Sequence, residues 1–171
     1  MLPTMLTKRL VLRPWNEADI DDLYVHWTDA DVRRYLWDDA IISRECATRT
    51  VQSGIETVES DGIGYWIIQL RLGSPLIGFC GFRFIDREKS RDIELMYGLH
   101  GLFWGMGLAT EACQTILGWL WNSTSFSRVY GRTDPPNTRS IGVLKRLGMT
   151  LVSSTRSTIT YVSEAPRSFE A

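Results

Sequence analysis

Three closely spaced apolar runs constrain the fold of this chain more than any other feature. They cover residues 65–70, 76–85 and 93–99, and turn-forming or charged residues separate them. Runs of this length are typical of β-strands, and strands joined by such short connections pair antiparallel. The middle of the chain therefore predicts a three-stranded antiparallel meander.

Helical and strand patterns flank this meander in the chain. A first helix is expected after Asn16, a good N-cap, because apolar residues recur at helical spacing from Ile20 to Trp27. We assign no element to the acidic segment 29–39. Further helices are expected at 43–61, at about 108–121 and from Asn137 or Thr138 to Leu147, and strands at 8–13, 128–133, 149–154 and 157–162. This order predicts an α/β fold with a mixed sheet and helices on both faces.

Length and charge narrow the classes of protein. The 171 residues suit a single domain over 1–171, with 163–171 expected as a loose tail. Lys and Arg total 19 against 20 Asp and Glu, so we expect no nucleic-acid partner. No apolar stretch is long enough to span a bilayer and no signal-peptide pattern is present, so no membrane partner and a cytoplasmic location are expected. The three cysteines and two histidines lack ligand spacing, so no metal is expected.

A glycine-containing loop leads from the third run into a helix. Small residues at Gly105, Gly107 and Ala109 let the backbone approach a ligand closely, and the free N–H groups of a helix N-terminus favour phosphate. No Lys or Arg lies between Leu99 and Thr110, so main-chain amides would bind the anion. The spacing fits neither a P-loop nor a dinucleotide fingerprint. The alternative is a tight turn that needs glycine for geometry alone.

The stretch from Trp104 to Ala112 resembles the acyl-CoA loop of the GCN5-related N-acetyltransferases, the GNAT family. Segments 7–14, 76–81 and 134–140 are similar to parts of the branch that contains the ribosomal-protein N-terminal acetyltransferases, so the resemblance covers nearly the whole chain. It implies a mostly antiparallel twisted sheet with a bulged central strand. It also implies direct transfer of an acetyl group from acetyl-CoA to a primary amine.

The resemblance also implies where coenzyme A binds. The pyrophosphate would lie on the loop amides, and the pantetheine arm would pair with the strand edge exposed by the bulge. Trp104 stands where the family usually has Arg or Gln, and Met106 stands where a basic residue is common, which suggests weaker charge assistance. The implied cofactor-binding residues are Met96, Tyr97, Gly98, Leu99, Trp104, Gly105, Met106, Gly107, Leu108, Ala109, Thr110, Asn137 and Arg139. Alternatively the strand is continuous, Asn137 is only a helix cap, and Arg139 is only solvated.

Two residues are candidates for proton transfer. Glu94 lies among apolar residues, where burial favours proton uptake by a carboxylate, and it is the candidate base. Leu144 occupies the position where many relatives have a tyrosine acid, so Ser140 is the candidate acid. Alternatively Glu94 pairs with Arg83, and Ser140 makes a helix-capping or backbone hydrogen bond. No Cys/His pair is visible, so no covalent intermediate is expected.

The acceptor site is expected near the first two helices and the meander ends. Tryptophans and tyrosines there, together with Asp29, Asp31, Asp38 and Asp39, would suit a cationic amine. Alternatively the aromatic residues are core and the acids are solvated. The resemblance favours a peptide or protein N-terminal amine. A small-molecule amine (polyamine, aminoglycoside or amino acid), a non-catalytic acyl-CoA-binding domain and an interaction protein remain alternatives, in a monomer or a homodimer.

Overall fold

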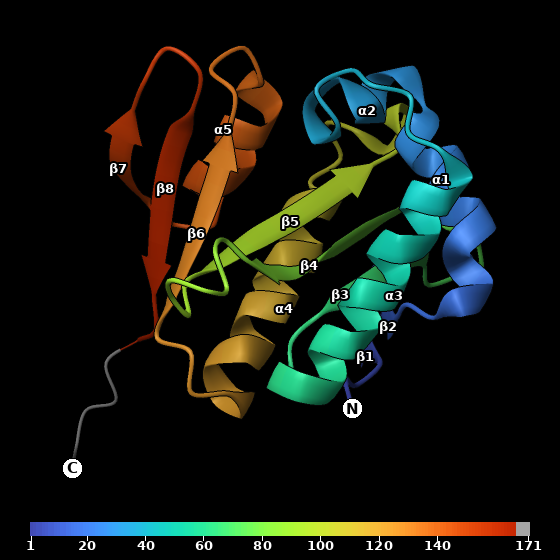
Figure 1. The fold of residues 1–171 in the computed structure, drawn as a ribbon, viewed down its shortest axis with the longest axis horizontal. Coiled ribbons are helices and arrows are strands. Elements are labelled where there is room, and N and C mark those ends of the chain that lie inside the picture. The colour runs from blue at the N-terminus through green and yellow to red at the C-terminus, as the bar shows by residue number, and fades with distance from the viewer. Residues whose placement is uncertain (167–171) are drawn as a thin grey trace.

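The computed structural model describes residues 1–166, and a single sheet of eight strands runs through them (Figure 1). The strands are β1 (Met5–Leu6), β2 (Leu10–Pro14), β3 (Tyr65–Leu70), β4 (Gly78–Phe84), β5 (Ile93–Leu99), β6 (Arg128–Thr133), β7 (Thr150–Ser154) and β8 (Ile159–Glu164). Their order is β1-β2-β3-β4-β5-β6-β8-β7. The predicted meander is confirmed, because β3, β4 and β5 are antiparallel neighbours.

The strands β5 and β6 form the one parallel pair of this sheet. Their pairing covers Ile93 with Val129 and Glu94 with Tyr130, and β5 then continues to Leu99 without β6. The other edge of β5, which faces β4, stays paired with that strand in one register from Ile93 to Leu99. The expected bulge therefore does not appear in that pairing. The two strands diverge nonetheless, and the β5 edge that faces β6 is left without a strand partner beyond Glu94.

Helices cover both faces of the sheet, as the order of elements predicts (Figure 1). They are α1 (Ile20–Thr28), α2 (Ala30–Leu36), α3 (Arg44–Asp61), α4 (Leu108–Ser123) and α5 (Thr138–Arg146). One apolar cluster lies with α4 and includes Trp66, Phe82 and Leu108. The other lies with α1 to α3 and includes Trp27 and Phe79. The alternation along β4 sends neighbouring side chains into different clusters.

The acidic segment 29–39 contains a helix that the sequence pattern did not predict. Asp29 accepts hydrogen bonds from the amides of Asp31 and Val32 at 3.0 and 3.3 Å, so it caps α2. Asp38 and Asp39, just after this helix, have φ of 51° and 63° in the left-handed region, which ends it. The segment is thus ordered by its own carboxylates.

The expected loose tail is wrong for its first residues. Ser163 and Glu164 belong to β8 and pair with Val129 and Arg128 of β6. Residues 167–171 of that tail lie outside the described residues. No helix in the described part of the chain is long and apolar enough to cross a membrane.

Candidate active site

A cavity of about 830 Å³ lies where β5 and β6 diverge. It is lined by β5, the loop that leads into α4, the first turn of α5 and part of α2. Every residue that the sequence assigns to cofactor binding or proton transfer lines it. The structure therefore brings together groups that lie between residues 94 and 140 of the chain.

The glycine loop has the backbone that a close ligand contact needs. Gly105 and Gly107 have φ of +74° and +75°, a region that L side chains rarely adopt. Gly107 is the N-cap of α4 and provides no side chain to cap the helix. The N–H groups of the first turn of α4 therefore face the cavity without a side-chain cap, which suits an anion.

Arginines from other segments surround this loop, although it contains none. Arg9 donates to the carbonyl oxygen of Met106 at 2.8 Å and pairs with Glu111 at 2.6 Å. Arg146 donates to the hydroxyl of Thr110 at 3.2 Å, and Arg146 and Thr110 line the cavity, whereas Arg9 does not. Positive charge that the sequence pattern lacked locally is thus supplied by residues distant in the chain.

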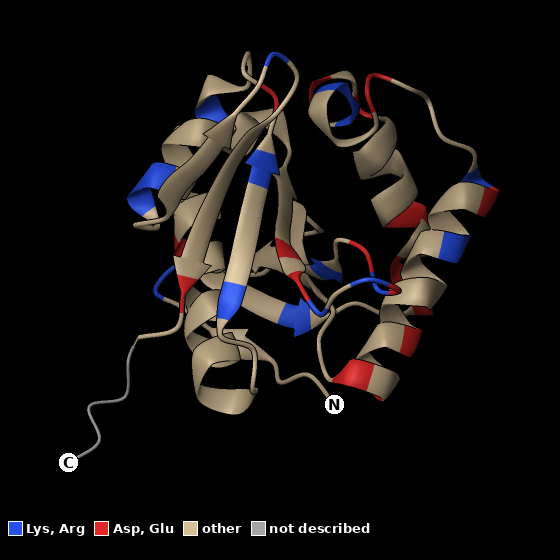
Figure 2. Cartoon of the chain, turned by 60° about the vertical axis from the view of Figure 1, so that its left-hand side comes forward, with Lys and Arg blue, Asp and Glu red and all other residues tan. Residues whose placement is uncertain are grey.

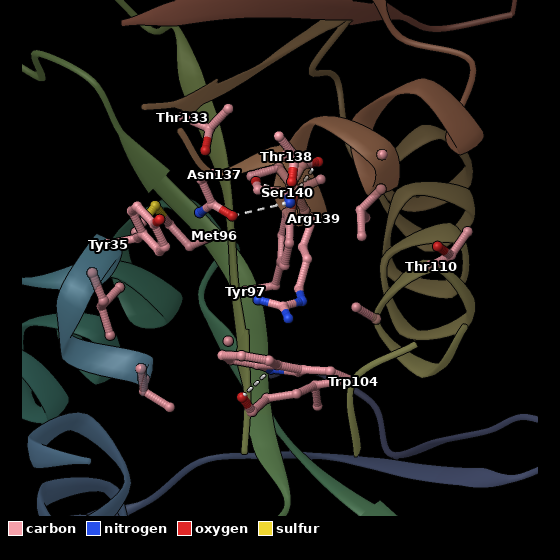
Figure 3. Close-up of a pocket in the computed structure, with 18 of the residues that line it drawn as sticks. Tyr35, Met96, Tyr97, Trp104, Thr110, Thr133, Asn137, Thr138, Arg139 and Ser140 are labelled. Atoms are coloured by element: carbon pink, nitrogen blue, oxygen red, sulfur yellow. Dashed lines mark hydrogen bonds between the residues drawn. The ribbon is translucent and has the colours of Figure 1, made fainter. Parts of the chain in front are cut away.

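Trp104 joins three elements at this end of the cavity (Figure 3). Its indole N–H donates to the carbonyl oxygen of Leu99, the last residue of β5, at 2.8 Å. The guanidinium of Arg139 on α5 lies 4.5 Å from the centroid of the Trp104 ring. Trp104 therefore holds the end of β5 and the start of α5 together, and Arg139 is not simply solvated.

A hydroxyl pair lies between β5 and α5 (Figure 3). The hydroxyl oxygens of Tyr97 and Ser140 are 2.7 Å apart. Asn137 caps α5, because its side-chain oxygen accepts from the amide of Ser140 at 3.1 Å. Burial raises the pKa of Tyr97 above its ordinary value, so its hydroxyl keeps its proton near neutral pH. The sequence placed Tyr97 on the cofactor strand but did not reveal this hydrogen bond.

Glu94 lies between two guanidinium groups and not in purely apolar surroundings. Its side chain is 4% exposed. Arg83 donates to Oε2 from Nε at 3.0 Å, and Arg132 donates to Oε1 and Oε2 at 3.0 and 2.9 Å. The hydrogen bond to Glu94 raises the pKa of Arg132. The pair with Arg83 was the alternative from the sequence, whereas the contact with Arg132 was not foreseen.

Only a few of the acidic and aromatic side chains that were expected to form the acceptor site line the cavity. Of the four aspartates, Asp31 lines the cavity, Asp29 caps α2, and Asp39 pairs with Arg33 at 3.0 Å. Tyr35 also lines the cavity, but Trp15, Trp27 and Trp66 are buried core residues. The alternative, that most of these aromatic residues are core, is the better description.

Two cysteines near the site are poor nucleophiles. Cys80 and Cys113 are fully buried, and burial raises the pKa of both thiols. Within residues 1–166, no group of three or more His, Cys, Asp or Glu side chains is arranged to hold a metal ion.

Comparison with known proteins finds a matching family and relatives of this chain. A family model described as "Acetyltransferase (GNAT) domain" matches residues 9–150. A relative from Bacillus licheniformis, the uncharacterized N-acetyltransferase p20, is 31% identical over 147 residues, which cover 85% of this chain and 82% of that protein.

Solved structures share the same fold. An acetyltransferase from Agrobacterium tumefaciens superimposes with a TM-score of 0.81 at 22% identity, covering 96% of this chain and 95% of that chain. The ribosomal L7/L12 alpha-N-protein acetyltransferase RimL, in complex with coenzyme A, gives a TM-score of 0.79 at 17% identity, covering 94% and 97%.

Proposed function

The chain belongs to the GNAT family of acetyltransferases, and we propose that it transfers the acetyl group of acetyl-CoA directly to the N-terminal amine of a peptide or protein. One observation carries the proposal. A single cavity extends from the uncapped N-terminus of α4, along the free edge of β5, to the buried carboxylate of Glu94. The likeness to RimL, named as an alpha-N-protein acetyltransferase, supports the choice of acceptor.

The residues of the loop fit a diphosphate. Amides at the start of α4 donate hydrogen bonds without a competing side-chain cap, and Arg139 and Arg146 add positive charge at the cavity wall. The free edge of β5 offers main-chain N–H and C=O groups to an amide-containing arm, as an added strand would pair with it. We therefore propose that the residues named from the sequence bind acetyl-CoA.

The reaction needs a proton acceptor for the amine. The amine nitrogen forms a bond with the thioester carbonyl carbon and loses a proton, and the carbon–sulfur bond breaks. Oε1 of Glu94 accepts one hydrogen bond, from Arg132, so a lone pair of this oxygen is available to a water molecule. We assign to Glu94 the acceptance of the amine proton through such a water.

The departing thiolate needs a proton. Ser140 lines the cavity, and the buried hydroxyl of Tyr97 lies 2.7 Å behind its oxygen. In the proposed step Ser140 donates its proton to the thiolate, Tyr97 replaces the proton on Ser140, and Tyr97 recovers its proton from solvent. This pair takes the place of the tyrosine acid that many relatives have at the position of Leu144.

Thiol release tests the proposal. Acetyl-CoA is incubated with short peptides that have a free N-terminus, and with the same peptides acetylated beforehand as controls. Release that requires the free amine supports the proposal. Acetyl-CoA binding without release from any amine would indicate a non-catalytic domain, and release with small amines but not peptides would replace the acceptor class.

A further inference from the structure

A second cavity, of about 460 Å³, lies between α3 and the neighbouring strands β3 and β4. Arg83 lines both this cavity and the larger one, so the two adjoin at the residue that holds Glu94. The proposed transfer reaction assigns no role to this second space. Because the second cavity lies beside Glu94, the proposed proton acceptor, it extends the larger cavity on the side where the amine would bind.

The second cavity is lined by basic residues. Arg49, Arg83 and Arg87 line it, and among residues 1–166 no Asp or Glu does. Their carboxylate partners lie outside it: Arg83 pairs with Glu94 in the larger cavity, Arg87 pairs with Asp61, and Arg49 is 3.8 Å from Glu45. Figure 2 shows basic residues on the strands that flank β5. Its lining therefore has an excess of positive charge.

Hydrogen-bond donors in this cavity remain unused. A guanidinium has five N–H donors, and Arg83 reaches Glu94 through Nε and Nη2, leaving Nη1. The indole N–H of Trp37, another lining residue, is buried and has no hydrogen-bond partner in the described part of the chain. Burying such a donor without a partner is costly, and a ligand that accepts a hydrogen bond would compensate this cost once the indole turns its N–H toward the cavity.

We propose that the second cavity binds an anionic group of the acceptor, a carboxylate or a phosphate, while the amine of the same molecule lies near Glu94. This inference rests on the proposed transfer to an amine. The larger cavity has both signs of charge, with Glu94 and Asp31 among its carboxylates for the cationic end, whereas the second cavity has arginines and, among the described residues, no carboxylate, which suits the anionic end. The acceptor is thus an amine with an anionic group along its chain, in an acidic peptide N-terminus or a small amino acid.

Matched substrates test this charge preference. Thiol release is measured with peptides that carry Glu or Gln at the second and third positions, and with small ω-amino carboxylic acids and their amides. We expect kcat/KM to be about tenfold higher or more for the charged member of a pair, which corresponds to roughly 1.4 kcal/mol. Preference within the peptides or within the small amines identifies the source of the anion.

Variants locate the anion-binding group. Arg49→Gln removes a charge from the second cavity, and Trp37→Phe removes only the indole N–H, so each should reduce the charge preference. Arg44→Gln is the matched control, because Arg44 lies on the same helix and pairs with Asp21 outside both cavities. Melting temperatures show whether each variant is folded.

Equal rates for acids and amides, or a preference that neither Arg49→Gln nor Trp37→Phe changes, would overturn the inference while leaving acetyl transfer intact. Failure of every amine, charged or neutral, to release thiol would overturn the proposed function, and the inference with it.

Discussion

The hydroxyl of Tyr97 on β5 lies 2.7 Å from the hydroxyl of Ser140 on α5 and 3.2 Å from its carbonyl oxygen, so this side chain links the strand to the last helix at the cavity wall. If the pair delivers one proton, the two residues act as a unit. Tyr97→Phe and Ser140→Ala should each lower kcat by about a hundredfold, the low end for general acid catalysis.

The double variant should then be little worse than either single variant, because each change already breaks the same relay. Steady-state kinetics give kcat, and calorimetry with acetyl-CoA shows whether binding is retained. Effects that multiply in the double variant would mean that the hydroxyls act independently.

Gly107→Val should abolish acetyl-CoA binding. Gly107 has φ +75°, and a Cβ there would lie 3.6 Å from Nη2 of Arg9, so a branched side chain would crowd the guanidinium that bonds to Met106 and distort the loop that leads into α4. Gly73→Val is the matched control, because Gly73 has φ +85° in a turn outside both cavities. Both variants should lose about 1–2 kcal/mol of stability through left-handed strain, but only Gly107→Val should lose binding. Equal affinities in the two variants would contradict a phosphate site at the loop.

Glu94→Gln should lower kcat more than it changes acetyl-CoA affinity. A Glu94 that accepts the amine proton through water contributes about 10²–10⁴-fold to the rate. The loss should shrink as pH rises above about 8, the range in which a peptide N-terminal amine deprotonates unaided. The pH–rate profiles of wild type and variant measure this.

Arg83→Gln, assayed with an acceptor that has no anionic group, is the control for charge loss, since it removes one ion pair and keeps the carboxylate and its contact with Arg132. A pH-independent defect in Glu94→Gln equal to that of Arg83→Gln would show that Glu94 is structural.

His26 should make the protein less stable in acid. It is fully buried, both ring nitrogens lack a hydrogen-bond partner within residues 1–166, and burial lowers its pKa to about 3. The unfolded chain takes up a proton near pH 6.5 while the folded chain does not, so stability is complete above that pH and falls as pH decreases toward 3. Between pH 7 and 5 the loss from this residue is about 2 kcal/mol.

His26→Phe should remove that part of the pH dependence, because phenylalanine does not titrate. Denaturant unfolding at pH 7 and pH 5 gives the two free energies for each protein. An unchanged difference in the variant would assign the acid sensitivity to other groups.

Local patterns in the sequence predict most elements of this fold well because apolar residues recur in them with clear helical or strand spacing. The runs at 65–70 and 93–99 are long and apolar, and they match β3 and β5 residue for residue. The glycine pattern before Leu108 likewise predicts a loop that depends on glycine, and in the structure Gly105 and Gly107 adopt the left-handed backbone that few other residues adopt. The helix α2 was missed because it is short and has a single buried residue, Val32.

The features of the site that local patterns did not predict are contacts between distant segments of the chain. Arg9 meets Met106 across 97 positions of the chain, and Arg132 meets Glu94 across 38. Such contacts depend on strand order and register, in particular the parallel pairing of β5 with β6, which no local period specifies. The sequence therefore indicated which residues line the site but not which charged side chains from distant segments contact them.

The brief contact between β5 and β6 has a mechanical consequence. Two residue pairs join the antiparallel sheet β1–β5 to the unit of β6, β7 and β8, so this strip is a natural hinge. Acetyl-CoA bound in the cavity between β5 and β6 would contact β5 on one side and α5 on the other. It would therefore reduce the motion of the two parts relative to each other. Amide hydrogen exchange in β6 and β8 should therefore slow on ligand addition, even at residues far from the ligand.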